Sequence, residues 1–219
     1  MTTEAPTLAP TERTTLHRRP NRGGHGLAEI DAILDAGLIC QIGYQMDGDP
    51  RVLSTLYWRM GEAVYWHGAR ESRALLAMVG HQICFSVTLL DGLVLARSAF
   101  HHSANYRSVI AFGAPEALPE GAEKGAAFRG MIDRLYPGRW DQIRAPSRAE
   151  MHATHVLRLK LTEASAKARA MGPVDSQGDL AQPGWAGVIP LSLRPGQAIE
   201  ASDLRPGGAP LDIPAWLDG

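Results

Sequence analysis

The stretch that decides the fold runs from residue 38 to residue 68 and reads "LICQIGYQMDGDPRVLSTLYWRMGEAVYWHG". It contains three short runs rich in β-branched and aromatic residues, separated at "DGDP" and at "MGE". Separators of this kind are typical of tight reversals between neighbouring antiparallel strands. The stretch therefore predicts an antiparallel meander.

Further strands are predicted downstream of the meander. Residues 82–100 read as a pair of strands that turn at "LDG", residues 105–118 as another strand, and residues 154–170 as a final strand. Strand, helix, strand alternation is not sustained, and about six strands with short turns favour a closed or nearly closed antiparallel barrel over a parallel α/β sheet. The predicted fold class is mainly β with peripheral helices.

Helices are predicted at three places, and the rest of the chain divides around them. Residues 27–36 carry apolar side chains at helical spacing before Gly37, residues 71–80 form a short helix, and residues 120–137 place Phe128 and Met131 on one face. We expect an extended N-terminal arm over residues 1–24, a barrel domain over 25–171, and a Pro/Gly-rich extension over 172–219 that packs on the barrel.

Charge and composition narrow the range of partners. The chain has 22 Lys+Arg against 23 Asp+Glu and a net charge of -1, without long runs of like charge, so we expect neither a nucleic acid nor an anionic membrane as partner. The sequence shows no apolar run of membrane-spanning length and no signal-peptide core, which indicates a soluble cytoplasmic protein. Cys40 and Cys84 lie in apolar runs and are expected to be inert core thiols.

The segment "YWHGARESR", residues 65–73, is a candidate phosphate site. A strand ends near His67, Gly68 lets the backbone turn, and Ser72 and Arg73 fall at the first turn of the next helix. Helix N-terminal amides with a hydroxyl and a guanidinium favour an anion. The alternative is an N-cap serine beside a solvated arginine.

The segment "RVLSTL" raises a related question. Ser54 and Thr55 lie inside an apolar strand that follows Arg51. Buried hydroxyls need partners, which a ligand or the neighbouring backbone can supply.

The histidines and the common motifs give less support for chemistry. His101 and His102 are adjacent, so on a strand they point to opposite faces, and no nearby acidic residue or cysteine completes a metal site. His152 and His155 have the same weakness, and we predict no metal site. The sequence has no P-loop, no GxGxxG and no GxSxG motif.

The order of these segments resembles the FMN-binding split-barrel family of pyridoxamine 5'-phosphate oxidase, and in particular its nitroimidazole-resistance (Nim-type) flavoproteins. The resemblance runs from about Arg18 to about Leu193 and rests on "LYWRMGEAVYWHGARESR", "VTLLDGLVLARSAFHHSANYRSVIAFG", "ASAKARAMGP" and "WAGVIPL". It implies a homodimer of six-stranded split barrels with FMN bound in clefts at the subunit interface.

The resemblance also implies a set of flavin-contacting residues. A first strand would lie along the flavin, the end of the next strand would contact it, a serine and an arginine would bind the phosphate, and a third strand would send polar side chains from the partner subunit. By these matches the cofactor-binding residues are Arg51, Val52, Leu53, Ser54, Thr55, His67, Gly68, Ser72, Arg73, Asn105, Arg107 and Ser108.

Two departures from the family pattern bear on the reaction. Ala74 stands where the oxidases carry a lysine after the phosphate arginine, and Trp185 has no arginine at the spacing of their substrate-binding pair. The resemblance therefore does not extend to genuine pyridoxamine phosphate oxidation. His67 matches the histidine that Nim-type proteins place near the flavin, and it is the candidate catalytic residue, with a packing role as the alternative.

The leading functional prediction is an FMN-dependent oxidoreductase that passes electrons from an unknown donor to a small electron-poor acceptor. One alternative is a flavin-binding or sensing protein without turnover. Another is a haem-binding split barrel with His101, His102 or His155 as axial ligand.

Overall fold

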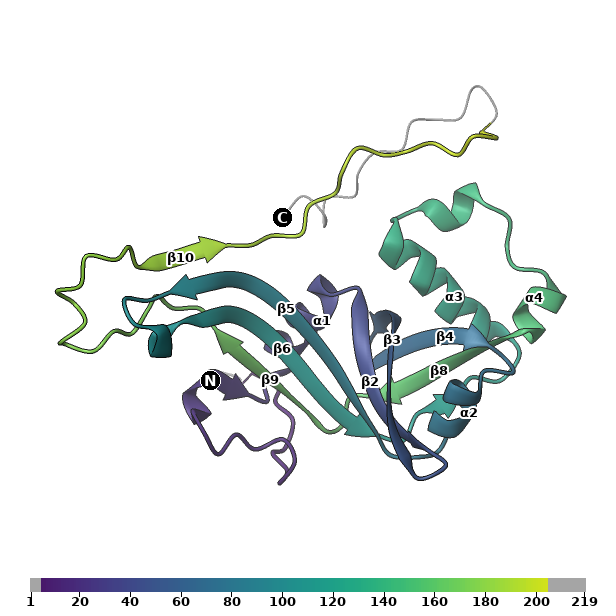
Figure 1. Ribbon diagram of the computed structural model, residues 1–219. Coiled ribbons are helices and arrows are strands. Elements are labelled where there is room, and N and C mark those ends of the chain that lie inside the picture. The colour runs from purple at the N-terminus through teal and green to yellow at the C-terminus, as the bar shows by residue number, and fades with distance from the viewer. Residues whose placement is uncertain (1–4, 205–219) are drawn as a thin grey trace.

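A curled antiparallel sheet dominates the computed structural model, which describes residues 5–204 (Figure 1). Its strand order is β1-β9-β6-β5-β2-β3-β4-β8-β7, and β10 pairs with β5. The strands are β1 (Gly23–Gly24), β2 (Ile39–Met46), β3 (Asp49–Met60), β4 (Ala63–Ala69), β5 (Ile83–Leu95), β6 (Ser103–Gly113), β7 (Glu116–Ala117), β8 (Thr154–Lys160), β9 (Ala164–Arg169) and β10 (Gly187–Pro190). The helices are η1 (Pro20–Arg22), α1 (Leu27–Ala36), α2 (Arg73–Met78), η2 (Ala99–His101), α3 (Ala122–Leu135), η3 (Arg139–Gln142) and α4 (Arg148–His152).

The predicted fold class is confirmed, and the sheet is the curled half-barrel of a split-barrel fold. The meander of residues 38–68 forms β2, β3 and β4 in the predicted order. Consecutive strands β8 and β9 pair with β4 and β6, which lie far apart in the strand order, and this connection requires the sheet to curl.

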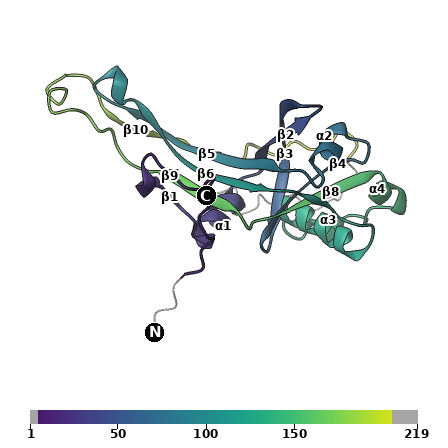
Figure 2. The ribbon, with the colours of Figure 1, turned by 90° about the horizontal axis from the view of Figure 1, so that it is seen from below.

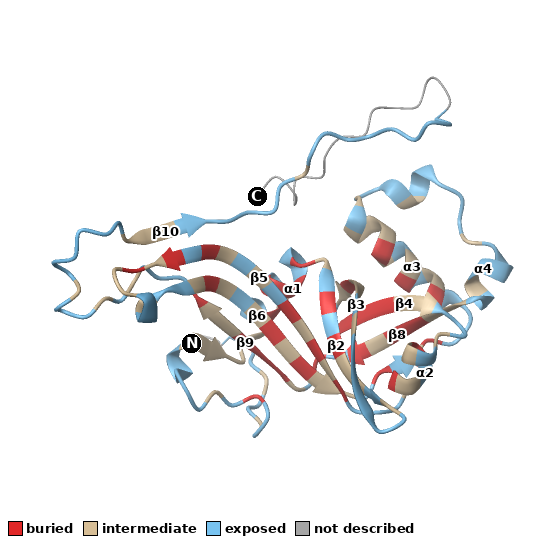
Figure 3. Cartoon of the chain, in the orientation of Figure 1, coloured by how far each residue is buried: buried red, intermediate tan, exposed pale blue. Residues whose placement is uncertain are grey.

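The core fills the inside of the curl. Ile30, Ile33 and Leu34 of α1 meet Trp66 and Phe85 from the strands in one apolar cluster, which Figure 3 shows as buried segments of the sheet and of α1. Burial of this much apolar surface is the main stabilising contribution to such a domain. Cys40 belongs to the same cluster, and burial raises the pKa of its thiol to about 12, so it stays protonated at neutral pH.

Two strand predictions were wrong in detail. Residues 83–95 form one continuous strand, and "LDG" is a β-bulge between Leu90 and Gly92 that leaves the pairing with β6 intact on both sides. A bulge accommodates an extra residue by local twisting, whereas a turn needs the chain to reverse. Residues 154–170 form two strands, β8 and β9, because the segment changes its pairing partner midway.

A second apolar cluster lies outside the curl, between the sheet and α3. Trp58, Tyr65 and Val156 of the sheet pack there against Ala127 and Met131 of α3. The side chain of Lys124 is also buried under this helix, where its Nζ donates to Glu120 Oε1 at 2.9 Å and to the Met151 carbonyl at 2.6 Å. The lysine thus ties α3 to the start of β8 through α4.

The N-terminal arm and the start of the C-terminal extension lie near the long β5–β6 hairpin, and after β10 the extension runs back toward the end of the molecule that holds α3 and α4 (Figures 1 and 2). Arg13 of the N-terminal arm forms an ion pair with Glu163 and lies over the ring of Phe112. The C-terminal extension pairs with the hairpin through β10 and continues with exposed apolar side chains such as Leu193 and Ile199. The predicted arm and extension also include residues 1–4 and 205–219, which lie outside the described residues.

No helix in the described part of the chain has the length and apolar character needed to cross a membrane.

Candidate functional site

Within residues 5–204, one edge of β3 lacks a strand partner along its first half. Between Asp49 and Leu56, β3 pairs with β2 on one side only, whereas β4 pairs with β3 only from Tyr57 to Met60. Beyond Trp66, β4 continues alongside β8. Backbone groups need hydrogen-bond partners, so this edge offers donors and acceptors to a ligand. It coincides with the segment "RVLSTL" that the sequence singles out.

The side chains of this edge agree with an open site. Val52 is 71% exposed in mid-strand, and Ser54 is exposed as well. Among the described residues, the hydroxyls of Ser54 and Thr55 make no hydrogen bond, so the neighbouring backbone does not occupy them. Arg51 contacts Asp49 at 3.2 Å, and Leu53 packs partly on the inner core.

His67 lies on the outer face of the sheet, beside the second apolar cluster. Its ring is 6.0 Å from that of Trp58 and 6.1 Å from that of Phe128 between centroids. Burial lowers the pKa of His67, which favours the neutral imidazole. Its Nδ1 is buried without a hydrogen-bond partner in the described residues, and such an atom calls for a bound molecule or water.

Gly68, next to His67, approaches the inner core. A Cβ at this position would lie 3.1 Å from Leu75 of α2, so a small residue lets α2 pack close to the end of β4.

Ser72 and Arg73 lie at the start of α2, as predicted. Ser72 is the N-cap, and its Oγ accepts from the Leu75 amide at 3.4 Å. The guanidinium of Arg73 is 77% exposed and contacts Asp47 at 3.1 Å. Exposed ion pairs contribute little free energy, so Arg73 can exchange Asp47 for a phosphate at small cost. Arg70, in contrast, already contacts Glu120 and His152.

The predicted residues of β6 are engaged within the chain. Oδ1 of the buried Asn105 accepts from Arg169 Nη1 at 2.5 Å and from the Met171 amide at 3.2 Å. Arg107 forms two hydrogen bonds with Asp91, and Ser108 donates to the Lys167 carbonyl. The structure therefore brings Arg51–Thr55, His67 and Gly68 into neighbouring strands, and places Asn105, Arg107 and Ser108 on a strand beyond β2 and β5.

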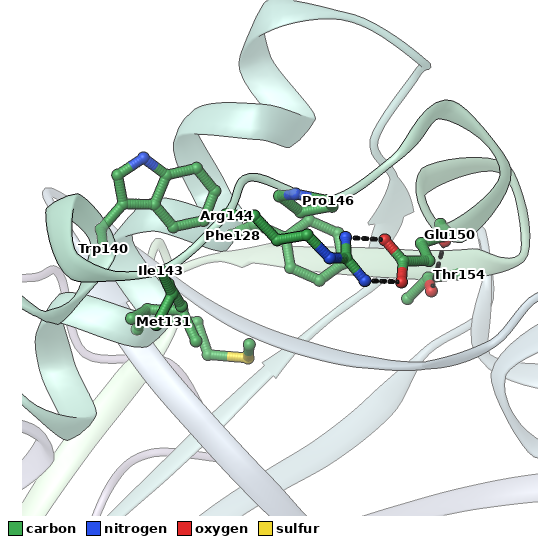
Figure 4. A pocket seen from close by; sticks show the side chains of 9 residues that line it. Phe128, Met131, Trp140, Ile143, Arg144, Pro146, Glu150 and Thr154 are labelled. Carbon is green, nitrogen blue, oxygen red and sulfur yellow. Dashed lines mark hydrogen bonds and ion pairs between the residues drawn. The ribbon is translucent and has the colours of Figure 1, made fainter. Parts of the chain in front are cut away.

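An apolar cavity of about 400 Å³ lies between α3, η3 and α4 (Figure 4). Phe128, Met131, Trp140 and Ile143 form its apolar side, and the bidentate pair of Arg144 and Glu150 lies at the other side. Since Phe128 also contacts His67, the cavity adjoins the outer face of the sheet. The sequence prediction missed this cavity, although the apolar residues of "WDQIRAP" after the helix were a possible signal.

The remaining histidines do not assemble a metal site. No group of three metal-ligating side chains occurs among residues 5–204. His101 and His102 both line a different cavity, at the hairpin end of the molecule. His155 pairs with Gly68 across β4 and β8.

Comparison with known proteins now adds to this geometry. The family profile described as Pyridoxamine 5'-phosphate oxidase matches residues 27–168. The flavocytochrome Anf3 from Azotobacter vinelandii is 36% identical, with a TM-score of 0.88 over 96% of this chain and 97% of that chain. The FAD and heme binding protein from Mycobacterium smegmatis is 32% identical, with a TM-score of 0.82 over 90% of this chain and 96% of that chain.

A candidate 5-nitroimidazole antibiotic resistance protein from Bacteroides thetaiotaomicron shares the fold at 16% identity, with a TM-score of 0.56 over 67% of this chain and 86% of that chain. Among curated proteins, no relative matches the chain. The long profile match and the two relatives above 30% identity agree with the split-barrel topology, and the chain belongs to the pyridoxamine 5'-phosphate oxidase family.

Proposed function

We propose that this protein binds a flavin along the open edge of β3 and uses it to reduce a small electron-poor acceptor. The observation that carries the proposal is the edge itself, where unpaired backbone groups from Asp49 to Leu56 lie beside unbonded hydroxyls. The relatives described as a flavocytochrome and as an FAD and heme binding protein support a flavin as the ligand.

Each part of the site has a separate task in this proposal. The backbone of β3 and the hydroxyls of Ser54 and Thr55 bind the polar rim of the flavin, while Ser72 and Arg73 bind its phosphate. The flavin, when bound, supplies the electron transfer. The imidazole of His67 lies on the outer face of the sheet, and burial favours its neutral form. It can accept or return a proton as the acceptor is reduced.

The acceptor is proposed to bind in the cavity beside α3. Its walls of Phe128, Met131 and Trp140 suit an apolar aromatic molecule, and Arg144 offers a cation to a nitro or carboxylate group. The contact between Phe128 and His67 joins this cavity to the outer face of the sheet.

A homodimer is part of the proposal. Val52 and Leu193 are large apolar side chains exposed in the single chain, and a second copy would cover them. In a dimer, Arg107 and Asn105 of β6 would approach the partner's flavin. The FMN prediction is retained, and FAD is the alternative that the name of the Mycobacterium smegmatis protein supports.

The deciding experiment measures flavin content in Arg73→Ala beside the matched surface control Arg139→Ala. Arg73→Ala should weaken flavin binding about tenfold or more, since it removes a charge-assisted contact to phosphate. Arg139→Ala, which removes an exposed guanidinium bonded to Gln142, should retain wild-type flavin content. Equal flavin content in both variants would contradict the assigned phosphate site.

Turnover is tested separately from binding. Heat release and mass identification distinguish FMN from FAD, and reduction by a nicotinamide donor followed by reoxidation with a nitroaromatic compound tests the reaction. Stoichiometric flavin without reoxidation by any acceptor would favour the flavin-sensing alternative.

A haem is the second candidate ligand, because two relatives are described as a flavocytochrome and as an FAD and heme binding protein. The apolar cavity beside α3 adjoins His67 through Phe128, and Nδ1 of His67 is buried without a hydrogen-bond partner in the described residues. A Soret band in protein reconstituted with haem tests this candidate. Loss of the band in His67→Ala but not in His102→Ala would place the ligand beside α3, and the converse would place it at the hairpin.

A further inference from the structure

A second cavity, of about 630 Å³, lies between the N-terminal arm, the start of β6 and the end of β9. It is distant in the fold from the open edge of β3, at the hairpin end of the molecule. Five cationic residues line it: Arg18, Arg19 and Arg22 from the arm, and Lys167 and Arg169 from β9. We call this cavity the basic pocket.

The five cations of the basic pocket form no ion pair within the described residues, and a carboxylate at its rim, that of Asp179, lies 3.8 Å from Nδ1 of His101. No aspartate or glutamate lines it, and within the described residues none of its five cations has a carboxylate within 4.0 Å. Several arginines elsewhere in the fold do have such partners, as Arg59 has Asp35 and Arg107 has Asp91. Since the chain as a whole carries a net charge of -1, this concentration of positive charge is local and favours an anionic ligand.

The guanidinium of Arg169 is buried and fixed in position, so its positive charge is a constant part of the basic pocket. It is only 6% exposed, and its guanidinium donates to Asn105 Oδ1, the Met171 carbonyl and the Gly172 carbonyl, all of them neutral acceptors. Burial and the nearby Arg22 lower the pKa of Arg169. A buried guanidinium held without a counter-ion is stabilised by an anion that enters the pocket.

The walls around these cations are held in place by further contacts. Asp175 binds both the amide and the guanidinium of Arg97, which ties the loop after β9 to the hairpin. Arg19 has a φ of 60°, a left-handed conformation that costs energy in a non-glycine residue. The pocket is therefore an ordered part of the fold.

The imidazoles at the rim have a defined bonding pattern. Nδ1 of His102 contacts the Ser98 carbonyl at 2.9 Å, so it must carry the proton, and Nδ1 of His101 contacts Ser98 Oγ at 2.8 Å. Among the described residues, Nε2 of each ring has no partner and is available to a ligand.

The size of the pocket and an aromatic rim point to a nucleotide. The volume exceeds the needs of a single phosphate, and the ring of Phe100, 90% exposed, offers a flat surface for stacking a base. We propose that the basic pocket binds the diphosphate group of a dinucleotide. This inference rests on the proposed flavin function, and the diphosphate belongs to a nicotinamide dinucleotide that donates electrons, because the flavin's own phosphate is assigned to Ser72 and Arg73.

The test removes three of the four pocket cations whose side chains form no hydrogen bond or ion pair within the described residues, in the triple variant Arg18→Ala/Arg22→Ala/Lys167→Ala. The matched control removes the same charge from another surface, in Arg139→Ala/Arg148→Ala/Lys160→Ala. Calorimetric titration of the full chain with FMN, FAD and NADPH gives the affinities. Arg169 is left intact because its bonds to Met171 and Gly172 stabilise the fold.

One result supports the proposal. NADPH affinity falls about tenfold or more in the triple variant, while FMN and FAD affinities stay unchanged and the control retains NADPH affinity.

Two other results overturn the proposal. In one, NADPH affinity agrees between the triple variant and its control. In the other, FAD affinity falls while NADPH affinity does not, which would place the flavin's own diphosphate in the pocket and contradict the assignment of Ser72 and Arg73. If the wild-type protein binds no flavin, the proposed function fails by itself, and the NADPH titration still tests the pocket.

Discussion

The open edge of β3 and the basic pocket both carry exposed arginines, yet the two regions differ in their electrostatics. Arg51 and Arg73 each lie near an aspartate of the β2–β3 turn region, Asp49 and Asp47. The cations of the basic pocket have no carboxylate near them in the described residues. An arginine with a nearby carboxylate can exchange partners, whereas a cluster of unpaired cations is stabilised only when an anion arrives.

The largest effect is expected from Trp58→Ala, which removes a large buried side chain from the apolar cluster on the outer face of β3 and β4. Trp58 is buried and stacks on Tyr65 with a centroid distance of 5.9 Å. The substitution should lower the free energy of unfolding by about 3–5 kcal/mol, measured by urea denaturation without cofactor. Flavin content should fall with it, because the outer face loses its support.

Trp58→Phe is the matched control for that cavity. The Nε1 of Trp58 has no hydrogen-bond partner in the described residues, so phenylalanine removes volume without breaking a hydrogen bond. It should destabilise less than alanine. Equal losses in the two variants would contradict filled volume as the source of this stability.

A smaller loss of stability is expected from Asn105→Ala. This variant tests whether Asn105, at the border of the basic pocket, stabilises the fold or binds the cofactor. Its Oδ1 accepts from Arg169 and from the Met171 amide, so the variant leaves both donors without this acceptor. The expected loss is about 2–3 kcal/mol of unfolding free energy in the protein without cofactor. Asn105→Asp, which keeps an acceptor, should lose less.

The converse outcome would restore the sequence-based assignment of Asn105. Unchanged stability combined with lost flavin would show that Asn105 binds the cofactor, as the family resemblance implies, and that Arg169 finds other acceptors.

The smallest effect is expected in the contribution of His67 to the pH dependence of the free energy of unfolding. Burial lowers the pKa of His67 in the folded protein, so the unfolded chain takes up a proton first as the pH falls. The stabilisation is complete above the unfolded pKa of about 6.5 and is lost as the pH drops below it. Denaturation measured at pH 8 and at pH 5.5 should show that the free energy of unfolding decreases less between these pH values in His67→Phe than in the wild type. An identical loss in both proteins would mean that His67 titrates normally when folded.

Local patterns predicted much of the fold and part of the site. The meander, α1 and the first turn of α2 follow from apolar spacing and turn residues within short windows, which is why Ser72 and Arg73 lie where the sequence places them. The bulge at Asp91 looked like a turn, because "LDG" suits both structures and only the pairing of β5 with β6 on both sides decides between them.

The assignments on β6 show the limit of sequence reasoning for individual side chains. The family resemblance implies that Asn105, Arg107 and Ser108 contact the flavin, and that role stays a prediction. The structure adds bonding partners from distant segments, since Asp91 binds Arg107 and Arg169 binds Asn105. These partners are separated from β6 by many residues, so no local pattern reveals them.

The sequence by itself determined the split-barrel family, the strand that carries "RVLSTL", and the position of His67 at the end of the next strand. Each depends on periodicity and on an ordered set of motifs along the chain. Only the tertiary structure decided that β3 has an open edge, that Phe128 meets His67, and that the arm and β9 together form the basic pocket. Strand pairing and charge compensation are relations between distant residues, and they exist only once the chain has curled around its core.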